Sequence, residues 1–259
     1  LEKEEGERFK IDSDAVSIAI NSPRGKCIEA LINLTLRACR LEDRSRNGDH
    51  RAVWAHYCSC FDAELRRSEE GEYEFATLVT QYLPNFLYMN KEWLLANLTR
   101  IFDQSNYLKW LCAMQGYSYV GTVYQEIYEF LKFNGDLSLV MNDENIKDKV
   151  EERIIQNIAV AYINDFESFD KEKSLIKLIL DRAIFEELSQ LVWFVWTRRG
   201  DENDKVRDKV YELWPLVLKN LDFKKKEDRK IASSLCHWAV FVNHIDRERM
   251  EWLNTIAPY

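Results

Sequence analysis

Apolar residues recur at helical spacing along almost the whole chain. In residues 144–164 one face is charged, and the other carries an apolar residue every four positions: Ile146, Val150, Ile154, Ile158 and Tyr162. This is the pattern of a helix that packs on a neighbour. The same reasoning predicts helices at 12–20, 23–41, 51–68, 72–89 with a break at Pro84, 91–104, 106–116, 121–134, 144–164, 172–182, 184–199, 203–221, 226–243 and 247–257.

The predicted helices follow one another with short connections, which favour antiparallel neighbours. Helix pairs recur about every 35–45 residues, within the range of helical repeats. The 8 glycines and 4 prolines are well below the average of about 18 and about 13, and sheet proteins need both at their turns. The sequence therefore predicts an all-α fold, an irregular α-solenoid of antiparallel helix pairs stacked as in TPR or HEAT arrays.

Composition limits the class of protein. Charged residues make up 31% and hydrophobic residues 46% of the chain, which argues against a disordered or a membrane protein. No secretory signal pattern opens the sequence, so we expect a cytoplasmic protein with reduced cysteines. The net charge of −8 disfavours a nucleic-acid partner, despite a basic run at 219–230 that we interpret as a solvated helix junction.

The predicted domain organisation is simple. Residues 1–10 are charged and lack helical periodicity until Phe9, so they are predicted to be a linker or the end of an upstream helix. Residues 11–259 are predicted to form one helical-repeat domain. Because the first residue is Leu rather than Met, we interpret the chain as a fragment of a larger protein.

The clearest local motif is the helix–helix corner AINSPRGKCIEAL at 19–31. Asn21 is expected to end the first helix in a left-handed conformation, and Ser22 to cap the second. Pro23 suits the first helical position, and Gly25 would let the preceding helix approach closely. The second helix is then expected to bury a stripe of apolar residues: Cys27, Ile28, Leu31, Leu34 and Ala38.

Most of the eight tryptophans are expected in the core. Trp54, Trp93, Trp193 and Trp238 have apolar neighbours in sequence, and 184–199 is apolar on all sides, so this helix should be covered on several faces. Tyr117 and Tyr119 lie between two glycines in a predicted loop, a composition typical of protein-binding surfaces. They are candidate partner contacts, with ordinary corner packing as the alternative.

Residues 43–50 are polar and contain a turn signal at Asn47–Gly48. Arg44 and Arg46 in this stretch are further candidates for partner contact. Arg44 and His50 also have the spacing of HEPN-type ribonucleases, in which His is the acid–base and Arg holds phosphate. A solvated loop is the alternative, because the helix that this motif requires is not predicted here.

A metal site is a second chemical possibility near this stretch. His50, His56, Cys58 and Cys60 are zinc-ligand types, but positions 58 and 60 point roughly 200° apart on a helix. We therefore interpret the cysteines as buried thiols on a packed helix. Neither a Glu-x-x-His pair nor a G-x-S-x-G elbow or dinucleotide fingerprint occurs. The sequence predicts no catalytic residue, metal or cofactor.

Three segments carry a resemblance to a known family: the corner at 19–31, FATLVTQYLPNFLYMNKEWLLANLTRIFD at 75–103, and WLCAMQGYSY at 110–119. They resemble the C-terminal helical region of bacterial antiphage proteins of the Avs-type STAND NTPases. The helical region of some sirtuin-domain defence proteins is similar. Residues 232–259 are similar in spacing to the closing repeats of those arrays.

This resemblance implies a sensor. In that family an N-terminal effector and a central NTPase precede a helical array that captures a phage protein such as terminase or portal. Capture then drives oligomerisation of the parent protein. The expectation is a non-catalytic protein-binding domain with a phage protein as target and the upstream domains as partners in cis. The alternatives are the helical ribonuclease with Arg44 and His50, and an internal scaffold or oligomerisation domain.

Overall fold

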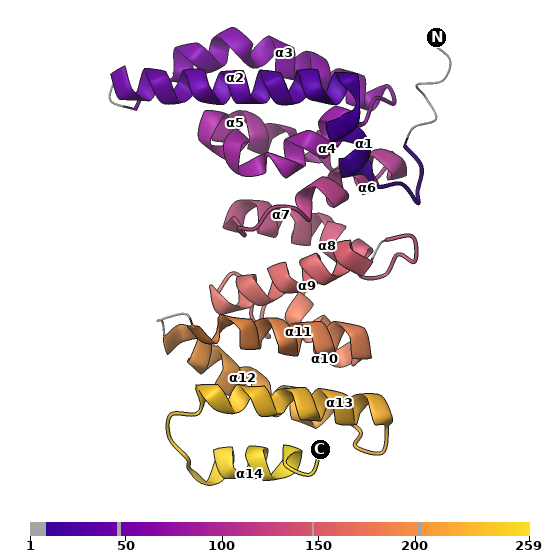
Figure 1. The fold of residues 1–259 in the computed structure, drawn as a ribbon, viewed down its shortest axis with the longest axis vertical. Coiled ribbons are helices and arrows are strands. Elements are labelled where there is room, and N and C mark those ends of the chain that lie inside the picture. The colour runs from indigo at the N-terminus through magenta and orange to yellow at the C-terminus, as the bar shows by residue number, and fades with distance from the viewer. Residues whose placement is uncertain (1–8, 46–47, 147, 201–203) are drawn as a thin grey trace. The chain divides into compact units, whose positions relative to one another are not determined.

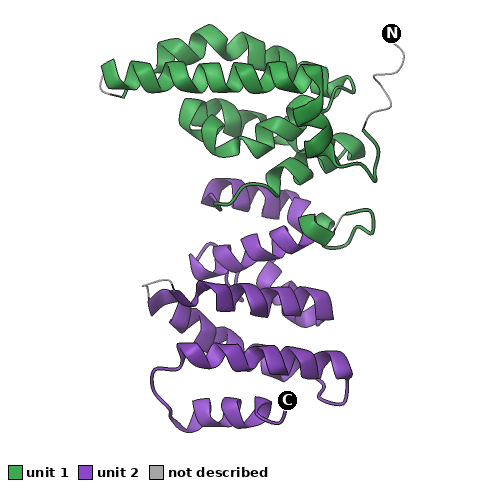
Figure 2. Cartoon of the chain, viewed as in Figure 1, with its two compact units in different colours: residues 1–122, 139–150 green, residues 123–138, 151–259 purple. Residues whose placement is uncertain are grey.

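The computed structural model describes residues 9–45, 48–146, 148–200 and 204–259. Within these ranges the chain forms fourteen α-helices and no β-strand (Figure 1). The predicted all-α class is therefore confirmed. The chain divides into two compact units, residues 1–122 with 139–150 and residues 123–138 with 151–259 (Figure 2), where the sequence predicted one domain over 11–259.

Unit 1 is built around a short, fully covered helix, α4 (Glu74–Gln81). Its residues from Glu74 to Thr80 are all buried, because α4 packs against each of the surrounding helices. The longer α2 and α3 run side by side as one layer over α4 and α5 (Figure 1). The surrounding helices are α1 (Ala15–Asn21), α2 (Pro23–Ser45), α3 (Arg51–Glu69), α5 (Leu83–Ile101) and α6 (Tyr107–Tyr117).

Unit 2 is centred on buried tryptophans. Trp214 and Trp238 are both fully buried, with ring centroids 5.7 Å apart, and Trp238 Nε1 donates to the Val192 carbonyl at 2.9 Å. The chain passes from one unit to the other after Thr122, within α8 (Asp136–Val140) and within α9 (Asp148–Ile163). The other helices of unit 2 are α7 (Gln125–Asn134), α10 (Leu175–Arg182), α11 (Phe185–Thr197), η2 (Arg198–Gly200), α12 (Asp204–Asn220), α13 (Lys226–Leu235), η3 (Cys236–Phe241) and α14 (Arg247–Ile256).

The predicted breaks in 72–104 are largely confirmed. The chain turns at Tyr82, and Pro84 lies in the first turn of α5, where its missing N–H costs nothing. The break predicted at residue 90 is a kink inside α5, with Asn90 in an extended conformation. The Asn90 side chain accepts the Trp93 N–H at 2.7 Å and so caps the second half of the helix.

One of the tryptophans predicted to lie in the core is exposed. Trp54 and Trp238 are buried and Trp93 is half-buried, but Trp193 is 50% exposed. The side chains that α11 buries include Leu188, Leu191, Val192 and Val195, and α10, α12 and α13 all pack against this helix. The helix is therefore covered on several faces, as predicted, and Trp193 lies on the face that stays exposed.

The corner between α1 and α2 follows the predicted logic with one exception. Ser22 Oγ accepts the Gly25 N–H at 2.8 Å, and Pro23 is the first residue of α2. Asn21, however, is not left-handed: it stays in α1, and its Nδ2 donates to the Ser17 carbonyl at 2.8 Å. The turn instead comes from extended backbone at Ser22, with φ −72° and ψ 148°.

Gly25 is the tightest point of this corner, and its replacement should destabilise unit 1. A Cβ at Gly25 would lie 1.7 Å from the Ala19 carbonyl oxygen, so Gly25→Ala must push α1 and α2 apart. We expect a loss of about 1–3 kcal/mol in urea denaturation. Gly121→Ala is the matched control, because a Cβ there meets no atom within 4 Å. Equal stability of the two variants would contradict this account of the corner.

None of the helices in the described ranges has the length and apolar character needed to cross a membrane.

Candidate functional site

The four side chains predicted to contact a partner lie in different settings. Tyr117 ends α6, is only 2% exposed, and packs edge-on against Phe102 with ring centroids 6.1 Å apart. Its prediction as a surface contact was wrong, because the helix extends to this residue and its ring fills the core. Tyr119 is 58% exposed, and Arg44 is exposed near the end of α2. Arg46 lies outside the described residues.

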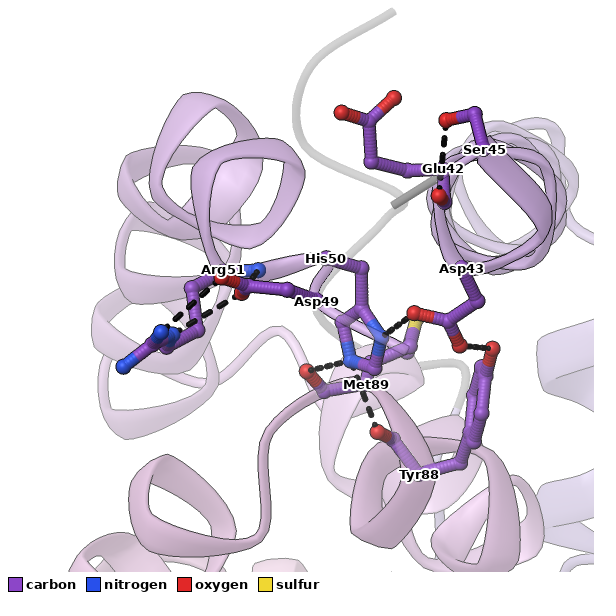
Figure 3. Close-up of polar contacts among 8 residues, drawn as sticks. All are labelled: Glu42, Asp43, Ser45, Asp49, His50, Arg51, Tyr88 and Met89. Carbon is purple, nitrogen blue, oxygen red and sulfur yellow. Dashed lines mark hydrogen bonds and ion pairs between the residues drawn. The ribbon is translucent and has the colours of Figure 1, made fainter. Parts of the chain in front are cut away.

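His50 is the centre of a polar cluster where α2, α3 and α5 meet (Figure 3). Its Nδ1 lies 2.7 Å from Asp43 Oδ1, and its Nε2 lies 3.1 and 3.0 Å from the carbonyl oxygens of Tyr88 and Met89. The Tyr88 hydroxyl donates to the other oxygen of Asp43. Each ring nitrogen of His50 therefore faces an oxygen atom of another residue.

The kink of α5 accounts for the contacts that His50 makes with the carbonyl groups of Tyr88 and Met89. A helix that ends leaves its last carbonyl groups without intrahelical donors, and the break at Asn90 does this to Tyr88 and Met89. His50 therefore acts as a clamp that caps the first half of α5 and ties it to α2 through Asp43.

The pKa values of Asp43 and Tyr88 in this cluster are shifted in opposite directions. Hydrogen bonds from Tyr88 and then from His50 lower the pKa of Asp43 below its usual value. Burial, followed by the hydrogen bond to Asp43, raises the pKa of Tyr88 to about 12. Asp43 is thus held as the carboxylate and Tyr88 as the phenol, which is the arrangement of a stable internal network.

This geometry gives little support to the ribonuclease hypothesis. An acid–base histidine needs a ring nitrogen that can reach substrate, and both nitrogens of His50 are bonded within the protein. Arg44 and His50 come from the ends of two different helices, α2 and α3. Among the described residues, Arg44 forms no hydrogen bond or ion pair with His50.

The residues weighed as zinc ligands are dispersed. His56 is exposed and stacks edge-on with Tyr57, Cys58 Sγ donates to Asp62 at 3.7 Å, and Cys60 is exposed. The prediction of buried thiols was therefore wrong for Cys60. In the part of the chain that the structure describes, no three His, Cys, Asp or Glu side chains gather where they could hold a metal ion.

The most unusual surface of unit 1 is the outer side of α2. The side chains that α2 buries belong to Ile28, Ile32, Thr35, Leu36 and Cys39. Leu34 and Leu41 are 53% and 57% exposed. Each lies two residues from a buried residue, and two residues turn a helix by roughly 200°, so both leucines point away from the core.

A second apolar stripe runs through these leucines. Its members, which we call the α2 seam, recur at alternating intervals of four and three residues: Cys27, Leu31, Leu34, Ala38 and Leu41. Cys27 is exposed, while Leu31 and Ala38 are half-buried. The stripe that the sequence predicted to be buried is thus mostly the α2 seam, and only Ile28 of the predicted set lies in the core.

A groove adjoins the N-terminal half of the α2 seam. It lies between α2 and α3, has a volume of about 430 Å³, and is lined by Arg24, Cys27, Ile28, Leu31, Cys60, Glu64 and Arg67. Glu64 pairs with Arg24 at 2.6 Å and with Arg67 at 3.6 Å, so the charges at this end are satisfied internally. Apolar walls beside an exposed apolar stripe are the composition of a protein-binding surface.

Unit 2 contains an acidic group that the sequence did not single out. Glu187 in the first turn of α11 is fully buried, and Arg182 Nη2 lies 3.1 Å from its Oε1. Neither carboxyl oxygen has hydrogen-bond geometry with a partner in the described structure. Burial raises the pKa of Glu187 to about 7, although Arg182 opposes the shift. The sequence signal, an acidic residue in the first turn of an apolar helix, is too common to identify it.

Glu187 should make the stability of unit 2 depend on pH near neutrality. Because the folded state holds the proton more tightly, stability is highest below the ordinary pKa of 4.5 and falls as pH rises to about 7. The total fall is roughly 3 kcal/mol at most. We expect Glu187→Gln to flatten this dependence in urea denaturation across that range, whereas the exposed neighbour Glu186→Gln should leave it unchanged. An unaltered slope in Glu187→Gln would contradict the assignment.

Comparison of the chain with protein-family models, with curated proteins and with solved structures finds no match.

Proposed function

We propose that this chain is the helical sensor region of a bacterial antiphage defence protein and works in the cytoplasm. In this proposal it is a non-catalytic α-solenoid of antiparallel helix pairs. It binds a phage protein such as terminase or portal and relays binding to an upstream NTPase or effector domain. The resemblance of 19–31, 75–103 and 110–119 to such arrays supports the proposal, and the all-α fold agrees with it.

The observation that carries the proposal is the α2 seam. Leucine side chains that remain more than half exposed on an ordered helix contribute little to the stability of the fold, because little of their apolar surface is buried. Single exposed leucines are common on protein surfaces, but Leu34 and Leu41 align with Leu31 and Ala38 along one line of the helix. An aligned stripe of this kind is typical of a surface that is covered when a partner binds.

A co-expression experiment tests the proposal. The tagged full chain is produced together with phage terminase or portal, and the retained phage protein is quantified after affinity capture. We expect retention by the native chain and by Val240→Asp, which alters an exposed apolar residue of unit 2. Leu34→Asp combined with Leu41→Asp should abolish retention.

Two outcomes would contradict the proposal. If neither phage protein is retained by the native chain, the chain is not a sensor for these targets. If the chain instead makes its upstream NTPase domain oligomerise without any phage protein, measured by light scattering, the chain is a scaffold rather than a sensor.

A further inference from the structure

The spacing of the α2 seam specifies the kind of partner that fits it. Apolar residues at alternating intervals of three and four occupy the a and d positions of a heptad, the pattern by which two helices pack side by side. The α2 seam keeps this spacing from Cys27 to Leu41. Its natural complement is therefore another helix with apolar residues at the same spacing.

The two flanks of the α2 seam differ. On the flank toward the core, Ile28 and Thr35 are 2% and 0% exposed, so this side is already covered by the chain's own helices. On the other flank, Arg37 and Arg44 lie seven residues apart and are both exposed. These are the heptad positions whose charges pair with the facing helix in coiled coils.

The two arginines are available for pairing. Within the described residues neither Arg37 nor Arg44 forms an ion pair, in contrast to Arg24 and Arg67, which share Glu64. Both stand in a protein whose net charge is −8, so the basic flank is a local feature rather than a general one. Opposite charge on the partner would favour binding and fix its register, while like charge would oppose it.

We infer that the α2 seam docks an amphipathic helix of another protein, one whose apolar residues follow heptad spacing and whose flanking residues are acidic. This inference rests on the proposed function and gives the chemistry of the contact. The exposed leucines beside the arginines favour a protein helix over a nucleic acid, since phosphate contacts need no apolar stripe. Antiparallel pairing of two copies of α2 would place the arginines of one copy beside those of the other. This contact between like charges disfavours a second copy of the chain as the partner.

The test uses designed peptides as probes of this surface. The first is a fluorescent peptide about three heptads long with Leu at the a and d positions and Glu at the e and g positions, which disfavours its own pairing. The second has Lys in place of each Glu, and the third keeps Glu but has Ser in place of each Leu. Binding to the full 259-residue chain is measured by fluorescence anisotropy. We expect the acidic peptide to bind at least tenfold more tightly than either control.

Substitutions on the chain then assign the contact. Leu34→Asp with Leu41→Asp should weaken the acidic peptide at least tenfold, and Val240→Asp should not. Arg37→Glu with Arg44→Glu should reverse the preference, so that the Lys peptide binds more tightly than the Glu peptide. This reversal keeps the test decisive, because a variant that had merely lost its fold would bind neither peptide.

Four results would overturn the inference: no binding of the acidic peptide, equal binding of the acidic and basic peptides, binding that survives the aspartate pair, or self-association of the chain that the aspartate pair abolishes. A single-stranded RNA bound through Arg37 and Arg44 but not through the leucines would also overturn it.

The capture of terminase or portal is measured separately. Peptide binding without phage capture would therefore refute the proposed target alone, and phage capture that depends on the α2 seam but occurs without peptide binding would refute this inference alone.

Discussion

Replacing Phe61 with alanine is expected to lower the free energy of unfolding of unit 1 by about 3–5 kcal/mol. Phe61 is fully buried in α3, with its ring stacked on Trp54 at 5.4 Å between centroids and edge-on to Phe86 at 5.2 Å. The rings of Phe75 and Trp93 lie 6.4 and 6.2 Å away. Removing the Phe61 ring leaves a cavity among large, rigid side chains, which cannot close by small movements.

Urea denaturation followed by tryptophan fluorescence measures this loss, since Trp54 and Trp93 are neighbours of Phe61. Cys60→Ala is the matched control on the same helix, because Cys60 is exposed, and we expect a change within about 0.5 kcal/mol. Phe61→Leu should fall between the two, because it retains part of the buried volume. A loss below about 1 kcal/mol in Phe61→Ala would show that this cluster is not the core of unit 1.

The fold class and most helices could be predicted because they depend on local patterns. The roles of Ser22, Pro23 and Gly25 in the corner at 19–31 were predicted correctly, because helix capping and close approach depend on neighbours in sequence. The five-residue helix α8 (Asp136–Val140) was not predicted. A segment of that length is too short to show helical periodicity.

The candidate site was harder to predict, because α2 carries two apolar stripes. The stripe through Leu31 and Leu34 and the stripe through Ile28 and Ile32 are both regular in sequence, and periodicity does not say which one the core covers. The packing of α1, α3, α4 and α5 against α2 decides this. The heptad spacing together with Arg37 and Arg44 is the signal that could have identified the exposed stripe.

The role of His50 depends on residues distant in sequence. Its partners include the carbonyl groups of Tyr88 and Met89, which are free because α5 kinks at Asn90. The sequence shows the asparagine and the histidine but not that they meet. Tyr117 was misplaced for a similar reason, since its ring packs against Phe102, which follows α5.

The buried ion pair of unit 2 gives the second large expected effect. Lys132 Nζ lies 2.9 Å from the Glu167 carboxylate, and the two side chains are 3% and 0% exposed. Glu167 also accepts the Tyr128 hydroxyl at 2.8 Å and the backbone N–H of Ser168 at 3.1 Å. We expect Lys132→Met to destabilise unit 2 by about 3–5 kcal/mol, because it leaves a buried carboxylate without its cation.

A double-mutant cycle separates the charge from the packing. Lys132→Met combined with Glu167→Gln removes both charges, and we expect it to be less destabilising than Lys132→Met alone. Arg247→Met is the matched control, because its ion pair with Glu251 is 94% and 64% exposed, and it should cost about 0–1 kcal/mol. Hydrogen exchange followed by mass spectrometry should localise the loss in Lys132→Met to the segment held by Glu167, from Ser168 to Leu175. The loss of stability in the double variant is compared with the summed losses in Lys132→Met and in Glu167→Gln. If the two are equal, the two charges are not coupled, and Glu167 is held by its neutral donors instead.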